Sequence, residues 1–150
     1  ILYISSRKSA NTRELMLSNS LAKPQKIIRR EPLILLVEDN EDNMSYAAAV
    51  LELSNYQFLE ATNGRVALDI AMDKLPDLIL LDIVMPKVDG IEVIETLRQN
   101  PLTNHIYILA VTGLTLPQDI QVIMDAGCDA YLEKPFTIEQ LENRISFFLC

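Results

Sequence analysis

The chain has 150 residues, of which 49% are hydrophobic, and a formal net charge of −8 at pH 7. This length suits one domain with an apolar core, and no apolar run approaches the roughly 20 residues that span a membrane as a helix. The two cysteines, Cys128 and Cys150, are too few for a disulfide framework. Free thiols suit a reducing compartment, so we expect a cytoplasmic protein.

Charge is distributed unevenly along the chain. Residues 1–30 have a net charge of +6 and residues 31–150 a net charge of −14, which together give −8. We interpret residues 1–30 as a basic linker or amino-terminal extension and residues 31–150 as the folded domain. An acidic domain repels nucleic acid and favours cations or basic partners. Contact with nucleic acid or a membrane surface therefore remains an alternative for the basic segment alone.

From Leu33 onward, short apolar runs alternate with helical patterns. Runs of branched apolar residues are typical of strands that are buried on both faces of a parallel sheet. We expect five such strands, at Leu33–Val37, Phe58–Ala61, Leu78–Leu81, Ile106–Val111 and Ala130–Leu132.

Each predicted strand is followed by a segment with helical periodicity. In the first, Met44, Ala47, Ala48 and Leu51 recur at the spacing of one helix face. Five βα units predict a parallel sheet with right-handed crossovers and helices on both faces. The fold class is therefore a doubly wound α/β sandwich.

The last two helices have recognisable end signals. We expect Thr115 to cap the fourth helix, with Pro117 in its first turn and Gly127 at its end. The residues from Thr137 match a capping box that opens the last helix. Ile138 is expected to face the core from this helix.

Polar residues follow four of the predicted strands. Glu38 and Asp39 come after the first, Asp82 after the third, Thr112 ends the fourth and Lys134 follows the fifth. Because the carboxyl ends of parallel strands meet at one edge of the sheet, where such folds bind ligands, these side chains are expected to share a site.

This set of side chains suits phosphoryl transfer. Mg²⁺ prefers carboxylate oxygens and keeps several waters, and the Lys134 ammonium offers a compact positive charge. A carboxylate can act as the nucleophile and form an acyl phosphate, and Asp82 is the best candidate because it follows the central strand. Thr112 is placed to donate its hydroxyl to a phosphoryl oxygen. A single aspartate after a strand is usually a cap or turn residue, so the prediction depends on the whole cluster.

Four motifs carry a resemblance to a known family. They are VEDN at Val37–Asn40, LLDIVMPKVDG at Leu80–Gly90, AVTG at Ala110–Gly113 and YLEKPF at Tyr131–Phe136. Over residues 33–149 the chain resembles the receiver domains of two-component response regulators. The resemblance implies a flavodoxin-like, five-stranded parallel sheet in the order 2-1-3-4-5. It also implies a phosphorelay or two-component role, with a histidine kinase or histidine phosphotransfer protein as the phosphoryl donor.

The resemblance also implies a role for each site residue. Asp82 would be the phosphoacceptor, and Mg²⁺ would be held by Glu38, Asp39, Asp82 and the backbone carbonyl of Val84. Thr112 and Tyr131 would be the switch residues, Lys134 the lysine that contacts the phosphoryl group, and Pro135 would follow a cis peptide bond. Phosphorylation would then change the surface of the fourth helix, the last strand and the last helix, where a downstream protein binds.

The chain departs from the commonest family pattern in three ways. The acidic pair is Glu-Asp, Gly113 replaces an alanine after the switch threonine, and Val84 and Leu114 are apolar. Because neither of these two side chains can position an attacking water, we expect slow self-dephosphorylation.

Two other classes stay open at this point. A receiver-like binding module would not depend on phosphorylation, but such modules typically lack the acceptor aspartate or the lysine, and this chain has both. A Mg²⁺-dependent aspartyl phosphatase would commonly need a second acid two residues after the nucleophile, where Val84 stands. We therefore expect no turnover enzyme. The sequence does not distinguish a stand-alone regulator from the receiver of a hybrid kinase, and it does not predict the oligomeric state.

Overall fold

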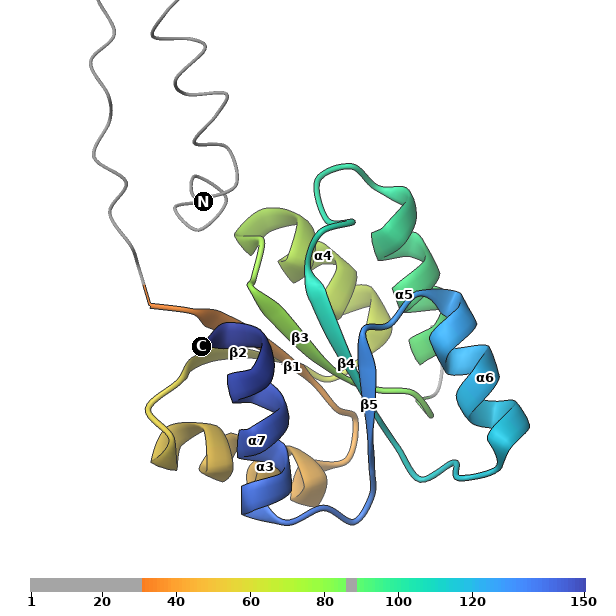
Figure 1. Cartoon of the computed structure of the whole chain (residues 1–150). Helices are drawn as coiled ribbons and strands as arrows, with labels where there is room; N and C mark the ends of the chain where they lie inside the picture. Colours follow the sequence, from red (N-terminus) through yellow and green to blue (C-terminus); the bar gives the residue numbers. More distant parts are fainter. Residues whose placement is uncertain (1–30, 86–88) are drawn as a thin grey trace, which may run out of the picture. The chain divides into compact units, whose positions relative to one another are not determined.

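The apolar runs form a single five-stranded sheet in the computed structural model, which describes residues 31–85 and 89–150. All neighbouring strands pair in parallel, in the order β2-β1-β3-β4-β5 (Figure 1), which confirms the predicted fold class and strand order. The strands are β1 (Leu33–Val37), β2 (Gln57–Ala61), β3 (Leu78–Asp82), β4 (Tyr107–Thr112) and β5 (Ala130–Glu133).

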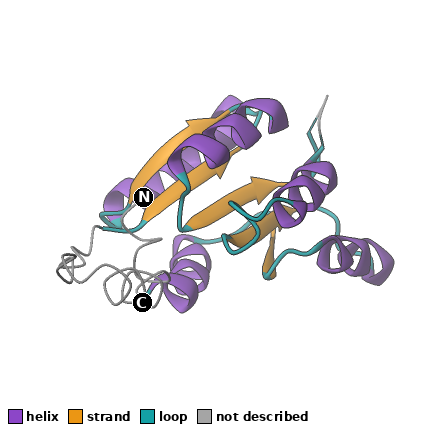
Figure 2. Ribbon diagram, turned by 90° about the horizontal axis from the view of Figure 1, so that it is seen from above, coloured by secondary structure: helices purple, strands orange, loops and turns teal. Residues whose placement is uncertain are grey.

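Helices cover both faces of this sheet (Figure 2). Helices α3 and α7 pack on one face, and α4, α5 and α6 pack on the other. Their bounds are α3 (Glu41–Leu53), α4 (Gly64–Lys74), α5 (Gly90–Gln99), α6 (Pro117–Ala126) and α7 (Ile138–Leu149).

The core explains why the strands read as unbroken apolar runs. In β1, Leu35 and Val37 join the apolar cluster under α4, α5 and α6, whereas Ile34 and Leu36 join the cluster under α3 and α7. Successive side chains of a strand point to opposite faces, so an inner strand that is covered on both faces needs an apolar residue at nearly every position. The edge strand β2 differs, because its Gln57 and Glu60 are exposed. Polar residues are then tolerated at the ends of the strands.

The helix ends agree with most of the sequence signals. Gly127 adopts a left-handed conformation (φ 118°) at the end of α6, and Thr137 forms the predicted capping box. The prediction for Thr115 is wrong: Leu116 is the N-cap of α6, without a side-chain bond. Pro117 starts this helix, and a residue before proline is held in the extended region, so the cap falls on Leu116. Ile138 is 43% exposed rather than inward, since it is the first residue of α7.

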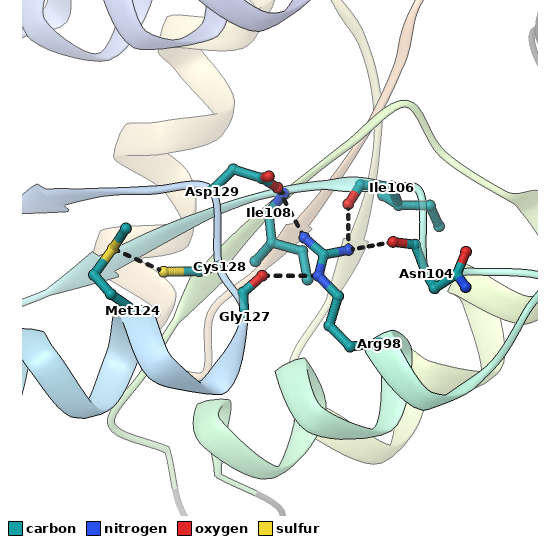
Figure 3. Close-up of polar contacts among 8 residues, drawn as sticks. All are labelled: Arg98, Asn104, Ile106, Ile108, Met124, Gly127, Cys128 and Asp129. Carbon is teal, nitrogen blue, oxygen red and sulfur yellow. Dashed lines mark hydrogen bonds and ion pairs between the residues drawn. The ribbon is translucent and has the colours of Figure 1, made fainter.

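Arg98 of α5 forms hydrogen bonds and an ion pair with residues next to the amino ends of β4 and β5 (Figure 3). Its guanidinium donates to the carbonyl oxygens of Ile106 and Gly127, each at 2.7 Å, and pairs with the Asp129 carboxylate at 2.8 Å. The same carboxylate accepts from the backbone N–H of Ile108 at 2.8 Å. This network connects α5, the end of α6 and the starts of β4 and β5.

Three earlier expectations concern other parts of the chain. The linker expected in residues 1–30 lies outside the described residues. In the part of the chain that the structure describes, no helix is long and apolar enough to cross a membrane. Cys128 is buried and Cys150 exposed, and both are free thiols.

Candidate functional site

The polar residues that follow the strands lie at one edge of the sheet. Asp82 is the last residue of β3 and Thr112 the last residue of β4. Glu38 follows β1 and Lys134 follows β5. The backbone N–H of Glu38 donates to the Ala61 carbonyl at 3.0 Å, so the pairing of β1 with β2 extends to this residue.

Three carboxylates converge at this edge. Glu38, Asp39 and Asp82 each offer an oxygen within 4.8 Å of the others; Glu38 and Asp82 are buried, and Asp39 is exposed. Carboxylate oxygens are hard ligands of the kind that Mg²⁺ prefers. One exposed member leaves room for the waters that Mg²⁺ retains, so these residues fit that ion.

Lys134 bridges the two buried carboxylates. Its Nζ lies 2.7 Å from Oε1 of Glu38 and 3.4 Å from Oδ2 of Asp82, whose side chains are only 6% and 8% exposed. Buried charges are stable only when they are paired. Glu38, Asp82 and Lys134 therefore form one electrostatic unit that is contributed by three different strands.

The pKa values of the two buried carboxyls move in opposite directions. Burial, followed by the neighbouring Glu38 carboxylate, raises the pKa of Asp82 to about 7, against a smaller lowering by Lys134. Burial also opposes ionisation of Glu38, but its hydrogen bonds with Lys134 and Asp82 outweigh this effect and lower the pKa of Glu38. Of the two crowded carboxyls, Asp82 is therefore the one that is harder to ionise.

Backbone donors hold both carboxylates in place. The N–H of Asn40 donates to Oε2 of Glu38 at 3.3 Å, and the N–H of Val84 donates to Oδ1 of Asp82 at 3.2 Å. The Val84 side chain itself is 60% exposed beside the site. The loops after β1 and β3 therefore orient the acidic groups.

Gly90 allows α5 to start close to the end of β3. A Cβ at this position would lie 2.5 Å from the Cα of Ile83 and 2.8 Å from the carbonyl oxygen of Asp82. The N–H of Gly90 donates to the Ile83 carbonyl at 3.0 Å. Sequence reasoning misses this packing requirement, because an Asp-Gly pair such as Asp89-Gly90 by itself indicates only a turn.

The two candidate switch residues lie on neighbouring strands. Thr112 is fully buried; its Oγ1 accepts from the N–H of Leu114 at 2.9 Å, and its carbonyl accepts from the N–H of Lys134 at 2.8 Å. Tyr131 lies on β5 opposite Ala110 and is half-buried against the cluster under α4, α5 and α6. Thr112 is thus linked through its backbone to the lysine of the site.

Helix α3 and the loop after β5 meet beside the site, a feature that the sequence analysis did not anticipate. The Lys134–Pro135 peptide bond is cis, the isomer that the resemblance implied. The Tyr46 hydroxyl donates to the Phe136 carbonyl at 3.1 Å. A cavity of about 470 Å³ is lined by residues of α3 and of this loop, and it reaches Asp82 and Lys134. Tyr46 lies off the helix face formed by Met44, Ala47, Ala48 and Leu51, so helical periodicity does not point to it.

Fold and site together define a response regulator receiver domain. The family model for this domain matches residues 34–146, and the chain belongs to that family. Receiver domains act in two-component signalling and bind Mg²⁺ in their active sites.

Curated relatives support this assignment. The chain is 38% identical over 116 residues to the polar-differentiation response regulator DivK of Brucella anthropi, and the alignment covers 77% of this chain and 94% of DivK. DivK of Brucella ovis is 37% identical with the same coverage.

Solved structures are similar over the same region. Chemotaxis protein CheY4 of Vibrio cholerae has a TM-score of 0.76 at 28% identity, covering 80% of this chain and 100% of CheY4. The receiver domain of the sensor histidine kinase PA1611 from Pseudomonas aeruginosa has a TM-score of 0.75 at 29% identity, covering 80% of this chain and 98% of that domain. That structure has a magnesium ion coordinated in its active site cleft.

Proposed function

We propose that this receiver domain accepts a phosphoryl group on Asp82 and thereby switches the binding of a downstream protein. The observation that carries the proposal is the position of Lys134, whose Nζ lies 3.4 Å from Asp82 and 2.7 Å from Glu38 at the carboxyl edge of the sheet. A cation fixed against the acceptor carboxylate can offset the charge that a phosphoryl group brings to it.

Mg²⁺ is the cofactor that these residues suit. Glu38, Asp39 and Asp82 would hold it, together with the Val84 carbonyl that the family pattern implies. When bound, Mg²⁺ supplies positive charge that lowers the repulsion between the acceptor carboxylate and the phosphoryl oxygens. Asp82 would then be deprotonated and available for attack.

The chemistry of transfer follows from the groups in the site. A carboxylate oxygen of Asp82 attacks the phosphorus of a phosphohistidine, an O–P bond forms and the P–N bond breaks. The donor nitrogen keeps the electron pair of the broken bond, and the imidazole leaves as the neutral base once it is protonated. Lys134 pairs with a phosphoryl oxygen, and the Thr112 hydroxyl donates to another, because its oxygen already accepts from Leu114 and its own proton is left for donation.

The output would arise from a shift between two states of the domain. Movement of Thr112 toward the phosphoryl group would make room for Tyr131 to turn inward from its half-buried position on β5. The surface of α6, β5 and α7 would then change and bind a downstream protein. The phosphoryl donor would be a histidine kinase or a histidine phosphotransfer protein.

Several further features belong to the same proposal. The domain acts as a switch without turnover of a substrate, because Val84 stands where a phosphatase would need a second acid. We assign residues 31–150 to the receiver and residues 1–30 to a basic linker. A cytoplasmic location remains a prediction from the two free thiols.

Labelling with acetyl phosphate tests the proposal. The protein is incubated with acetyl phosphate, with Mg²⁺ or with a chelator, and its intact mass is measured. We expect one phosphoryl group per chain with Mg²⁺ and none with the chelator or in Asp82→Asn. A folded wild-type sample that takes up no phosphoryl group would favour a binding module that does not depend on phosphorylation.

A further inference from the structure

We infer that Tyr46 is a positioning residue for the phosphoacceptor site, acting through the loop that carries Lys134. The inference rests on the proposed function of Asp82 and Lys134, and it adds a residue that lies outside the four sequence motifs. It concerns the contact between helix α3 and the loop from Lys134 to Thr137.

Two interactions join Tyr46 to this loop. The Tyr46 hydroxyl donates to the Phe136 carbonyl at 3.1 Å. The two aromatic rings also contact each other, with their centroids 5.6 Å apart and their planes at 51°. Tyr46 is nevertheless 41% exposed, so burial alone does not explain its position, whereas the paired contacts with one residue do.

Helix α3 and the loop each deliver charged groups to the site. The helix begins at Glu41, and only its N-cap, Asn40, separates it from the acidic pair Glu38 and Asp39. The loop begins with Lys134, whose backbone N–H is bound to the Thr112 carbonyl at 2.8 Å. The contact between helix and loop therefore lies next in the chain to both the acidic pair and the lysine of the site.

The loop is held at both ends and bridged near its middle. Lys134 is bound to β4 at one end, and at the other Thr137 caps α7 through its bond with the N–H of Gln140. Phe136 lies between these two points, where Tyr46 contacts it. The Tyr46 contact thus restrains the part of the loop that neither end holds directly.

A cavity beside the loop increases the contribution that the contact between Tyr46 and Phe136 makes to the position of the loop. Its volume is about 470 Å³, and its lining includes Tyr46 and Ala47 of α3 and Pro135 and Phe136 of the loop. Side chains that line a cavity have fewer protein packing partners on the side that faces it. The loop is therefore less supported by packing here. The hydrogen bond and the ring contact of Tyr46 make a correspondingly larger contribution to holding the loop in place.

Lys134 is the residue through which such a restraint acts on the chemistry. Its long and flexible side chain must hold Nζ at 2.7 Å from Glu38 and 3.4 Å from Asp82. A less restrained loop gives the ammonium more conformations and lowers the fraction in which it contacts both carboxylates. Phosphorylation would then slow, while the carboxylates that hold Mg²⁺ remain in place.

Tyr46→Phe is the test variant, because it removes the hydroxyl and keeps the ring. Leu53→Ala is the control, since Leu53 lies on the same helix and is 72% exposed. The first readout is the maximal rate of phosphorylation by acetyl phosphate. We expect this rate to fall about three- to tenfold in Tyr46→Phe, because the variant loses one hydrogen bond. We expect the Mg²⁺ affinity, measured by calorimetry, to stay within about twofold.

The second readout does not depend on phosphorylation. Brief acetylation with acetic anhydride, followed by peptide mass spectrometry, measures how accessible each lysine is. Lys134 is 23% exposed and Lys74 is 57% exposed. In Tyr46→Phe we expect acetylation of Lys134 to rise about threefold, with no change at Lys74 and no change at either lysine in Leu53→Ala.

The outcomes separate this inference from the proposed function. Absence of phosphorylation in the wild type would overturn the proposed function, while the acetylation pattern would still test the position of Lys134. Wild-type acetylation of Lys134 and a wild-type rate in Tyr46→Phe would overturn the inference alone. If acetylation in Tyr46→Phe rose equally at Lys134 and Lys74 and the melting temperature fell, Tyr46 would only stabilise the fold. This outcome would also overturn the inference.

Discussion

Replacing Asp82 by asparagine is expected to stabilise the metal-free protein, with an effect that depends on pH. Burial and the Glu38 carboxylate raise the pKa of Asp82 from 3.8 to about 7. An acid whose pKa is raised on folding contributes stability below its unfolded-state pKa, and this stability is lost as the pH rises through the folded-state pKa. The wild type should therefore lose stability between about pH 4 and pH 7, and Asp82→Asn should not.

The size of this effect follows from the same two pKa values. Each pH unit over which only the folded state holds the proton changes the free energy of unfolding by about 1.4 kcal/mol. Between pH 5 and pH 8 the wild type should thus lose about 2 to 3 kcal/mol relative to the variant. The lowered pKa of Glu38 acts below its ordinary value of 4.5, so it does not contribute in this range.

Urea denaturation at pH 5, 6, 7 and 8 in the presence of a chelator measures this difference. Asparagine keeps the size of the side chain and an oxygen that can accept from the Val84 N–H, so the comparison isolates the charge. Asp39→Asn is the control, because it removes an exposed carboxylate of the same cluster and should retain the pH dependence of the wild type. Parallel pH profiles for wild type and Asp82→Asn would refute this account of the buried pair.

Three further predictions concern the surroundings of the site. Arg98→Ala should lower the free energy of unfolding by about 2 to 4 kcal/mol in urea titrations, because it leaves the part-buried carbonyl groups of Ile106 and Gly127 without a charged donor. A change near zero would contradict this. Gly90→Ala should slow phosphorylation by acetyl phosphate and lower the melting temperature, since its Cβ would lie 2.5 Å from the Ile83 Cα; an unchanged rate would show that the loop relaxes freely. The phosphorylated wild type should persist for minutes or longer with Mg²⁺. Val84→Glu should shorten this lifetime, because it adds a group that can orient an attacking water, and Leu114→Ala is the control. Loss of the wild-type phosphoryl group within seconds would contradict the prediction.

Much of the fold could be predicted from local sequence, because the inner strands β1, β3 and β4 are covered on both faces and are apolar at nearly every position. The first helix likewise buries Met44, Ala47, Ala48 and Leu51 as its periodicity predicted. The errors occurred at helix ends, where a shift of one residue changes which side chain caps the helix or is buried. Leu116 rather than Thr115 is the N-cap of α6, and Ile138 is exposed because α7 has only begun there.

The site was predictable as a set of residues but not as a geometry. Strand ends brought Glu38, Asp82 and Lys134 to one edge of the sheet, since parallel strands all end there. Sequence could not show that Lys134 contacts both carboxylates, because that depends on the path of the loop after β5. It also missed Tyr46, whose partner Phe136 is 90 residues away and belongs to another element. Long-range contacts of this kind leave no local periodicity.

Identification of the residue that carries the phosphoryl group tests the central claim most directly. After reaction with acetyl phosphate and Mg²⁺, reduction with borohydride converts a phosphorylated aspartate to homoserine, which peptide mass spectrometry locates in the chain. We predict homoserine at position 82 alone, and none when Mg²⁺ is withheld. Modification at Glu38 or Asp39, or at no carboxylate of a folded and fully reacted sample, would contradict the account.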